Sequence, residues 1–497
     1  MIDAMGEGLC YLFEPTAFAV FSFSLVVSLV FGILPGLGVV VALTLALPFI
    51  FGMPLSLAML VMLGLSAAES TSGSVSAILL NMPGTPSNAA TIIDGFPMNQ
   101  NGEGPRAIGA AVISSTVGGI LAIPMALLMI PVVLKFIMIF GSPETFMLIS
   151  IGLITVAFIS TGSTVKGLIS AGLGVLASFV GNQATTGIDR LTFGAIFLYS
   201  GFGLTALALG LFAIAEMMDI LLKGEHSIVK IKTKTRLSAV FHGIRDGYRN
   251  KRVMLVSSII GYIIGLIPVA GGNVACFIAY GQAKQTSKHP EKFGKGSVEG
   301  VIAPESANNA VVAGALLTTL CLGIPGSVAG IFYLAGFLIV GITPGPPMLG
   351  EYLPIAMMMI FSIALGNIIG GAITLFAAPY LARIAQVSIH YLFPAVLVVV
   401  FCGVFAEAEH IWDFLVVIAF GLVGYILKKF GYNRPAFLLG YVLGLLFEKY
   451  FFLSLRAYGP FFWTSPLCLL MIAGIIILFT FPYLRQIFNR FWRRTEA

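Results

Sequence analysis

The sequence predicts an all-α polytopic membrane protein. Of its 497 residues, 58% are apolar and only 10% are charged. Apolar runs such as 17–34, 194–215 and 467–481 reach or approach the length of about 20 residues that crosses a bilayer as a helix. We expect roughly 10–13 spans, some of them broken. The chain has no long polar block, so no separate soluble domain is expected.

The net charge of +6 comes from basic clusters at membrane faces, and it does not indicate nucleic-acid binding. One cluster lies in the loop 223–252 and the other near the C-terminus, at 485–494. Basic loops stay on the cytoplasmic side, so we expect both segments there. The N-terminus carries Asp3, Glu7 and Glu14 but no Lys or Arg, and we expect it outside. The two halves would then be inverted, with one extra span at the end.

The stretch from Asn81 to Pro86 interrupts an apolar segment in the manner of a discontinuous membrane helix. Pro83 cannot donate a backbone hydrogen bond, and Gly84 relaxes the backbone dihedral angles. Thr85 suits the N-cap of a new helix, with Pro86 at its first position. Two helix ends would therefore meet in an apolar region, where their polar groups must be covered by protein or line a cavity.

The same order of features returns in the second half. Pro35 lies in a Gly/Pro break and has a counterpart in Pro268, 233 residues later. Pro83 has a counterpart in Pro325, 242 residues later. These similar offsets indicate a duplication, and paired breaks point to a transporter site at the repeat interface. The expected parts are a first membrane repeat, a second membrane repeat, and an extra C-terminal span with a cytoplasmic tail, at 1–235, 236–468 and 469–497.

Helix ends, rather than basic side chains, supply the candidate anion site. Amino ends at Thr85 and Ser327 would offer free N–H groups and the positive end of a helix dipole, which attract anions. Two simple proline kinks are the alternative, and their matched positions weigh against it. The candidate substrate-binding residues are the amides, hydroxyls and glycines in and near the two breaks: Asn81, Gly84, Thr85, Ser87, Asn88, Asn308, Asn309, Gly326 and Ser327.

Carboxylates and loop carbonyls supply the candidate coupling site. Glu69 and Glu305 lie in or next to apolar segments, where a carboxylate is a candidate for cation or proton coupling; a position at the membrane interface fits them equally well. Carbonyls at helix ends suit Na⁺. The candidate coupling residues are Gly36, Gly38, Glu69, Gly271, Gly272, Asn273 and Glu305. The coupling ion would be Na⁺ or H⁺, and we expect no cofactor and no other metal.

Other kinds of chemistry have little support. The sequence contains no HExxH, GxSxG or P-loop motif, so we do not expect an enzyme. The cluster 407–413 is rich in Glu, His and Asp, but its spacing fits no metal motif and a solvated loop is expected. The polar, turn-rich stretch 94–106 is likewise expected to be a loop at a membrane face.

Several motifs resemble those of one transporter family. They are spread over nearly the whole chain, at 73–85, 94–98 with Gly102 and Arg106, 293–296, 299–305, 308–310, 322–327, 341–346, and 439–444 with Glu448. On these residues the chain resembles the large membrane subunit of the tripartite tricarboxylate transporter family. It departs from the family's pattern at 67–72, which carries Glu69 and no Tyr, and after Pro268.

This resemblance implies secondary active uptake of a di- or tricarboxylate-type organic anion across the bacterial cytoplasmic membrane, by alternating access. It implies a small membrane subunit and a periplasmic solute-binding protein as partners, and coupling to a Na⁺ or H⁺ gradient. The alternatives are a cation/proton antiporter or exporter of related architecture, and a membrane scaffold or membrane-embedded enzyme that transports nothing.

Overall fold

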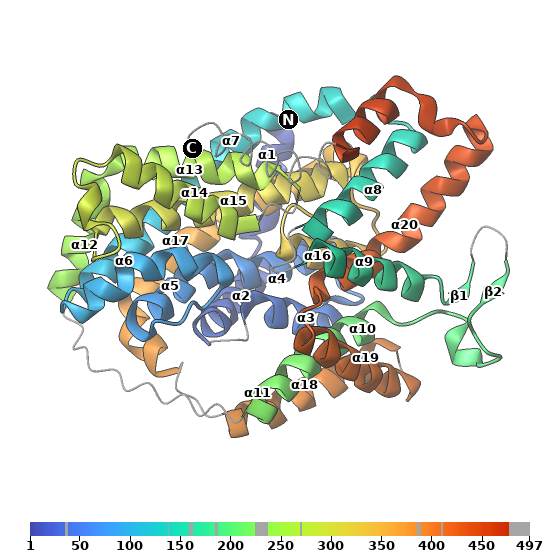
Figure 1. Cartoon of the computed structure of the whole chain (residues 1–497), viewed down its shortest axis with the longest axis horizontal. Coiled ribbons are helices and arrows are strands. Elements are labelled where there is room, and N and C mark those ends of the chain that lie inside the picture. Colours follow the sequence, from blue (N-terminus) through green and yellow to red (C-terminus); the bar gives the residue numbers. More distant parts are fainter. Residues whose placement is uncertain are drawn as a thin grey trace, which may run out of the picture. The chain divides into compact units, whose positions relative to one another are not determined.

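The computed structural model confirms an all-α protein (Figure 1). In the described part of the chain, β-structure is confined to one short antiparallel pair, β1 (Gly181–Asn182) and β2 (Asp189–Arg190). The structure describes residues 1–34, 38–137, 139–158, 163–183, 187–223, 237–268, 271–384, 389–408 and 411–476.

The helices of the first half run in short and long pieces. They are α1 (Ile2–Phe13), α2 (Pro15–Ile33), α3 (Gly38–Ile50), α4 (Leu55–Ala67), α5 (Glu69–Leu80), the 3₁₀ turn Pro86–Asn88, α6 (Ala89–Gln100), α7 (Gly104–Ile137), α8 (Ser142–Phe158), α9 (Thr164–Ser178), the 3₁₀ turn Ile196–Leu198, α10 (Leu204–Leu209), the π-helical segment Gly210–Ile214 and α11 (Ala215–Lys223).

The second half repeats this order. Its helices are α12 (Leu237–Arg249), α13 (Lys251–Leu266), α14 (Gly271–Thr286), the 3₁₀ turn Pro290–Lys292, α15 (Val298–Leu322), α16 (Val328–Ile339), the 3₁₀ turn Pro346–Leu349, α17 (Leu353–Ile384), α18 (Ile389–Ala408), α19 (Trp412–Lys429), α20 (Arg434–Tyr458) and the 3₁₀ turn Phe462–Thr464. α13, α14 and α15 lie side by side in Figure 1.

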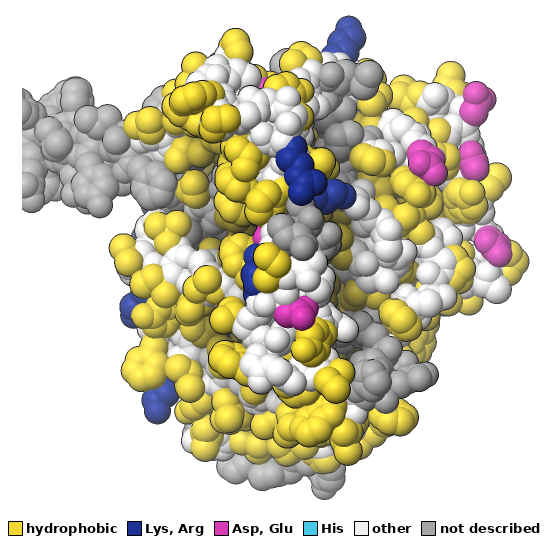
Figure 2. All heavy atoms as spheres, turned by 90° about the vertical axis from the view of Figure 1, so that its right-hand side faces the viewer, with side chains coloured by type: hydrophobic (Ala, Val, Ile, Leu, Met, Phe, Trp, Pro, Cys, Tyr) yellow, Lys and Arg dark blue, Asp and Glu magenta, His cyan; other side chains and the backbone are white. Residues whose placement is uncertain are grey.

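Six helical segments in the described residues are long and apolar enough to cross a membrane: Pro15–Ile33, Leu55–Leu80, Gly104–Lys135, Leu204–Leu222, Leu353–Ala378 and Arg434–Tyr458. Shorter apolar helices accompany them. Large apolar side chains face outward, among them Phe23 and Leu128, and Figure 2 shows a face on which hydrophobic side chains predominate over charged ones. This is the surface expected of a polytopic membrane protein. The span count of 10–13 stays a prediction.

The chain divides into two compact units, each built from both halves of the sequence. The first combines Met1–Ile137 with Phe202–Pro435, and the second combines Met138–Gly201 with Ala436–Ala497. In the second unit, α9 packs on α20, where a Cβ built on Gly174 would lie 2.0 Å from the carbonyl oxygen of Phe437. These compact units do not test the predicted repeat boundaries at 235 and 468, which stay a prediction.

Within the first unit, the first helix of each half packs on the long helix of the other half. A Cβ built on Gly8 of α1 would lie 2.7 Å from the carbonyl oxygen of Pro354 in α17. A Cβ on Gly243 of α12 would lie 2.0 Å from the carbonyl oxygen of Arg106 in α7. Glycine is therefore needed at both crossings. The matching contacts support the predicted duplication.

The first break forms as predicted, except for the role of Gly84. α5 ends at Asn81 in the left-handed region, with φ 57°. Thr85 caps the turn that follows, through reciprocal side-chain and backbone bonds with Asn88. Gly84 does not adopt a positive φ; instead, a Cβ there would lie 2.1 Å from the carbonyl oxygen of Gly32 and 2.5 Å from Cα of Gly73. Gly84 is needed for close packing, and the prediction that it serves backbone freedom was wrong.

The second break has the same construction. α15 ends at Gly323, with φ 65°, and Ser327 caps α16 by accepting the N–H of Gly330 at 3.2 Å. A Cβ on Gly326 would lie 2.3 Å from the carbonyl oxygen of Ala315. Positions 81 and 323, 84 and 326, and 85 and 327 all differ by 242. The two breaks are thus alike in detail, as their matched positions predicted.

The stretch 94–106 is mostly helical, and its prediction as a loop was wrong. α6 continues to Gln100 and α7 begins at Gly104, which leaves only 101–103 between them. Turn-forming residues misled the prediction, because α6 accommodates Pro97 inside its last turns.

Asp94, which the predicted loop would have exposed, is fully buried and joins α6 to the second half. Its Oδ1 accepts the backbone N–H groups of Gly294, Gly296 and Ser297 at 2.9, 2.8 and 2.7 Å. Its Oδ2 accepts the Tyr280 hydroxyl at 2.9 Å. A carboxylate that accepts several N–H groups is a strong fixing point for a backbone. The Asp94 carboxylate thus fixes the backbone that leads into α15.

Replacing Gly84 by Ala should destabilise the protein by about 1–3 kcal/mol, because the added Cβ overpacks against Gly32 and Gly73. Thermal unfolding of the purified chain in detergent measures the effect. Gly281→Ala is the control, since a Cβ at Gly281 meets nothing within 4 Å. Equal melting temperatures for the two variants would contradict this view of the break.

Replacing Asp94 by Ala should cost about 1–3 kcal/mol or more, because it leaves buried N–H groups unpaired. Asp94→Asn keeps an acceptor oxygen and should cost less. Glu351→Ala, at an exposed carboxylate, should change little. Unfolding curves of the three variants test the order, and an Asp94→Ala protein as stable as Glu351→Ala would refute the assigned role.

Candidate functional site

A fully buried carboxylate, Glu305 of α15, joins the first break to three helices. Its Oε1 accepts the Asn88 amide at 3.1 Å and the Thr91 hydroxyl at 2.5 Å. Its Oε2 accepts the Ser115 hydroxyl at 2.7 Å. Among the described residues, no Lys or Arg pairs with Glu305. The carboxylate is therefore held in the apolar interior by neutral donors alone, supplied by the first break, α6 and α7.

A second set of amides and hydroxyls continues this network between α5 and α15. Asn309 accepts the Ser70 hydroxyl at 2.7 Å through Oδ1. Its Nδ2 donates to the Thr71 hydroxyl at 3.0 Å and to the side-chain oxygen of Asn367 in α17. Asn88 also donates to the carbonyl oxygen of Ser70, at 2.9 Å. One connected network thus contains Glu305, the break and Asn309.

Five members of the network escaped the sequence analysis: Ser70, Thr71, Thr91, Ser115 and Asn367. Two signals could have found some of them. Ser70 and Thr71 belong to a polar run inside an apolar segment, and Asn367 is an isolated amide in an apolar helix. Thr91 and Ser115 carry no such signal, because single hydroxyls are common in membrane helices.

The first break also faces the amino end of α14. A Cβ built on Gly272 would lie 3.2 Å from Cβ of Ser87 and 3.5 Å from Oδ1 of Asn308. Ser87 shares a hydrogen bond of 2.8 Å with the Thr85 hydroxyl. Asn308 is 4% exposed, and within the described chain its Nδ2 has no hydrogen-bond partner. The structure thus brings together Gly272, Ser87 and Asn308, which come from three separate segments.

Three of the predicted coupling glycines and Asn273 lie at helix starts. Gly38 begins α3, and Gly271, Gly272 and Asn273 form the first turn of α14. In a first turn the N–H groups, rather than the carbonyls, lack partners within the helix. Their predicted role toward a cation stays a prediction. Gly36 lies outside the described residues.

Glu69 lies at the amino end of α3. Its Oε2 accepts the backbone N–H of Val39 at 2.7 Å. The same helix start touches the first break, because a Cβ on Gly38 would lie 3.8 Å from the carbonyl oxygen of Gly84. Glu69 is thus a carboxylate bound at a helix amino end beside the break.

The remaining predicted residues have local roles in the structure. Asn81 is exposed and supplies the left-handed end of α5. The Gly326 N–H donates to the Thr319 hydroxyl at 3.0 Å, so it is not free. Ser327 uses its hydroxyl to cap α16. These two groups of the second break are thus bonded locally, whereas the first break contributes to the buried network.

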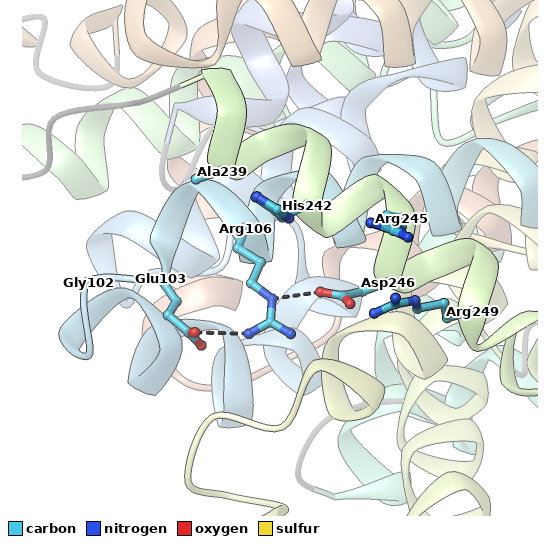
Figure 3. Close-up of a pocket in the computed structure, with 8 residues that line it drawn as sticks. All are labelled: Gly102, Glu103, Arg106, Ala239, His242, Arg245, Asp246 and Arg249. Atoms are coloured by element: carbon cyan, nitrogen blue, oxygen red, sulfur yellow. Dashed lines mark hydrogen bonds and ion pairs between the residues drawn. The ribbon is translucent and has the colours of Figure 1, made fainter.

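A separate pocket of about 380 Å³ lies between α12 and the start of α7 (Figure 3). Arg106 crosses it, donating to Asp246 at 2.6 Å and to Glu103 at 2.9 Å. Its lining is completed by Gly102, Ala239, His242, Arg245 and Arg249. This ion-paired cluster ties α7 to α12 and gives Arg106 a structural role.

In the described part of the chain, no group of three or more His, Cys, Asp or Glu side chains could hold a metal ion. The predicted solvated loop at 407–413 is mostly helical, because α18 runs to Ala408 and α19 begins at Trp412; residues 409 and 410 lie outside the described residues.

The family comparison extends over most of the chain. Residues 18–439 match the model of the tripartite tricarboxylate transporter TctA family. An uncharacterized 52.8 kDa protein in the TAR-I ttuC' 3'region of Agrobacterium vitis is 30% identical over 461 residues, which cover 92% of this chain and 91% of that protein. An uncharacterized protein in the TAR-II ttuC' 3'region of the same organism is 32% identical over 190 residues, which cover 38% of this chain and 78% of that protein. No solved structure matches.

The family match contains both breaks and every member of the buried network described above. It also agrees with the membrane-spanning helices and with the resemblance carried by the sequence motifs. The chain belongs to the tripartite tricarboxylate transporter TctA family.

Proposed function

We propose that this chain is the permease subunit of a secondary transporter that takes up a di- or tricarboxylate-type organic anion across the bacterial cytoplasmic membrane. A small membrane subunit and a periplasmic binding protein would work with it. The observation that carries the proposal is the buried polar network that links the first break to Glu305 and Asn309. A break that only kinked a helix would need no such network.

The substrate anion would be held by neutral donors. Ser87, which hydrogen-bonds Thr85, and Asn308 lie at the amino end of α14, where helix N–H groups add a positive field. Neutral donors suit a transporter, because an anion bound by fixed Arg or Lys charges leaves them slowly. Backbone and amide donors bind it less tightly and allow release on the other side.

Coupling to Na⁺ or H⁺ would use the two intramembrane carboxylates. Glu305 is buried among neutral donors, and one carboxylate oxygen of Glu69 accepts the backbone N–H of Val39. A carboxylate in such a place gains from binding a proton or a cation, since its charge is otherwise uncompensated. Carbonyls near Gly36, Gly38 and 271–273 are the further proposed ligands of a cation.

Alternating access would come from the duplicated architecture. One repeat-built part would move against the rest around the site, as in other transporters with paired broken helices. We propose that the basic segment 223–252, which from Leu237 on is helical in α12 and the start of α13 rather than a loop, and the C-terminus lie on the cytoplasmic side, from their Lys and Arg content.

Replacing Thr85 by Val removes the hydroxyl that bonds Asn88 and Ser87, and it should lower carboxylate uptake about tenfold, equivalent to about 1.4 kcal/mol. The measurement is uptake of labelled succinate and citrate into membrane vesicles that contain both membrane subunits, with and without added binding protein. Thr286→Val, at the exposed end of α14, is the control. Wild-type uptake that needs no binding protein would argue for an antiporter or exporter instead.

Replacing Glu305 by Gln keeps the shape of the side chain and removes its charge. Uptake should then lose most of its dependence on the imposed Na⁺ or H⁺ gradient, while substrate still binds. Exposed Glu291→Gln should leave the dependence unchanged. The same vesicle assay, run across Na⁺ concentrations and pH values, checks this. An unaltered gradient dependence in Glu305→Gln would remove this residue from coupling.

A further inference from the structure

The pocket between α12 and the start of α7 carries positive charge that its ion pairs leave unmatched (Figure 3). Arg106 binds both carboxylates of the lining, Glu103 and Asp246. Arg245 and Arg249 line the same pocket and are exposed, and neither has an ion-pair or hydrogen-bond partner among the residues that the structure describes. The lining thus has three arginines against two carboxylates, and the unmatched charge lies on α12.

The guanidinium groups of Arg245 and Arg249 are placed to share one anion. The two residues are four positions apart, so they lie one turn apart on the same side of α12. Like charges at this spacing repel each other, and an anion bound between them would offset that repulsion. His242 comes one turn before Arg245 and lines the same pocket, where its ring N–H adds a donor. An arginine fork matches a phosphate group in shape as well as in charge.

The counterpart of α12 in the first half keeps the packing but not the positive charge. α1 packs on α17 through Gly8, as α12 packs on α7 through Gly243. When the two helices are aligned on these glycines, the positions of the three basic side chains fall on Glu7, Cys10 and Glu14. Packing of this helix on its long partner therefore needs no basic side chains, and those of α12 require another explanation.

The pocket lies at one end of a candidate membrane span. Glu103 directly precedes the span Gly104–Lys135. α12 rests on α7 through Gly243 and exposes Phe241 and Tyr248, which are two turns apart on one side of the helix. Exposed aromatic side chains beside cationic ones are typical of helices in the interface between lipid and water. The basic groups of α12 would then stand at the level of the lipid headgroups.

We propose that this pocket binds the phosphate group of an anionic phospholipid, with Arg245 and Arg249 as the main donors and His242 as a third. The exposed rings of Phe241 and Tyr248 would pack against the lipid beside the headgroup. Basic pockets at the cytoplasmic surface of membrane proteins bind anionic headgroups in this way. The inference goes beyond the proposed function, because such a site would anchor α12 to the membrane surface whatever anion the chain transports.

Native mass spectrometry of the purified, delipidated chain in detergent tests the site. Phosphatidylglycerol, phosphatidylcholine and inorganic phosphate are added in separate titrations. The wild-type chain should bind phosphatidylglycerol about tenfold more tightly than either of the others, because only this lipid combines a net negative phosphate group with acyl chains.

Replacing both arginines, Arg245→Gln with Arg249→Gln, should weaken phosphatidylglycerol binding about tenfold, since it removes the charged donors. The matched control is Lys284→Gln with Lys288→Gln, which removes the same charge from exposed positions outside the pocket. Its affinity should stay within twofold of wild type.

A folded arginine double variant that binds phosphatidylglycerol within twofold of wild type overturns the inference. Equal binding of the two lipids also overturns it, and so does inorganic phosphate that binds as tightly as phosphatidylglycerol, because the site then takes a free anion. If the Gln variant does not fold, Arg245→Lys with Arg249→Lys decides: it loses the fork geometry, and an unchanged affinity overturns the inference. None of these outcomes bears on carboxylate uptake, so the proposed function stands or falls separately.

Discussion

The structure depends on burying the carboxylate of Glu305 in an apolar interior without a basic partner among the described residues. An isolated charge there is expensive, so neutral donors must surround it. Asn88, Thr91 and Ser115 meet this need, and they come from the first break, α6 and α7. The position of the break relative to α15 is therefore fixed by an electrostatic requirement as well as by packing.

Local stereochemistry then determines how the chain can turn at that place. Thr85 and Asn88 satisfy the helix start by themselves, and Asn81 completes the helix end. Gly84 lets the turn pack directly against Gly32 and Gly73, where a Cβ would not fit. The backbone is thus satisfied inside the protein, as a break within a membrane requires, and the side chains of Ser87 and Asn88 remain available for contacts outside the turn.

The breaks could be predicted from sequence because their causes are local. Proline, glycine and capping residues act within a few positions of the chain. Asn81, Thr85 and Ser327 were therefore identified correctly as residues that end or begin a helix. Contacts between residues far apart in the chain could not be predicted, since nothing in the sequence around Asn367 indicates that Asn309 is its hydrogen-bond partner. Asp94 shows the opposite failure, in which local turn residues suggested a loop although long-range contacts stabilise a buried helix. The sequence pattern cannot show which candidate residues contact the substrate or the coupling ion. A helix amino end attracts many different anions, so it does not identify one ligand.

The crossed packing of α1 on α17 and of α12 on α7 has a consequence for biosynthesis. When the ribosome has made only the first half, α7 is without its covering helix, and α1 waits for a partner more than 300 residues downstream. The two halves cannot mature one after the other as independent folding units. Insertion into the membrane must therefore precede final assembly, and a chain truncated before α17 would present the uncovered face of α1 to quality-control proteases.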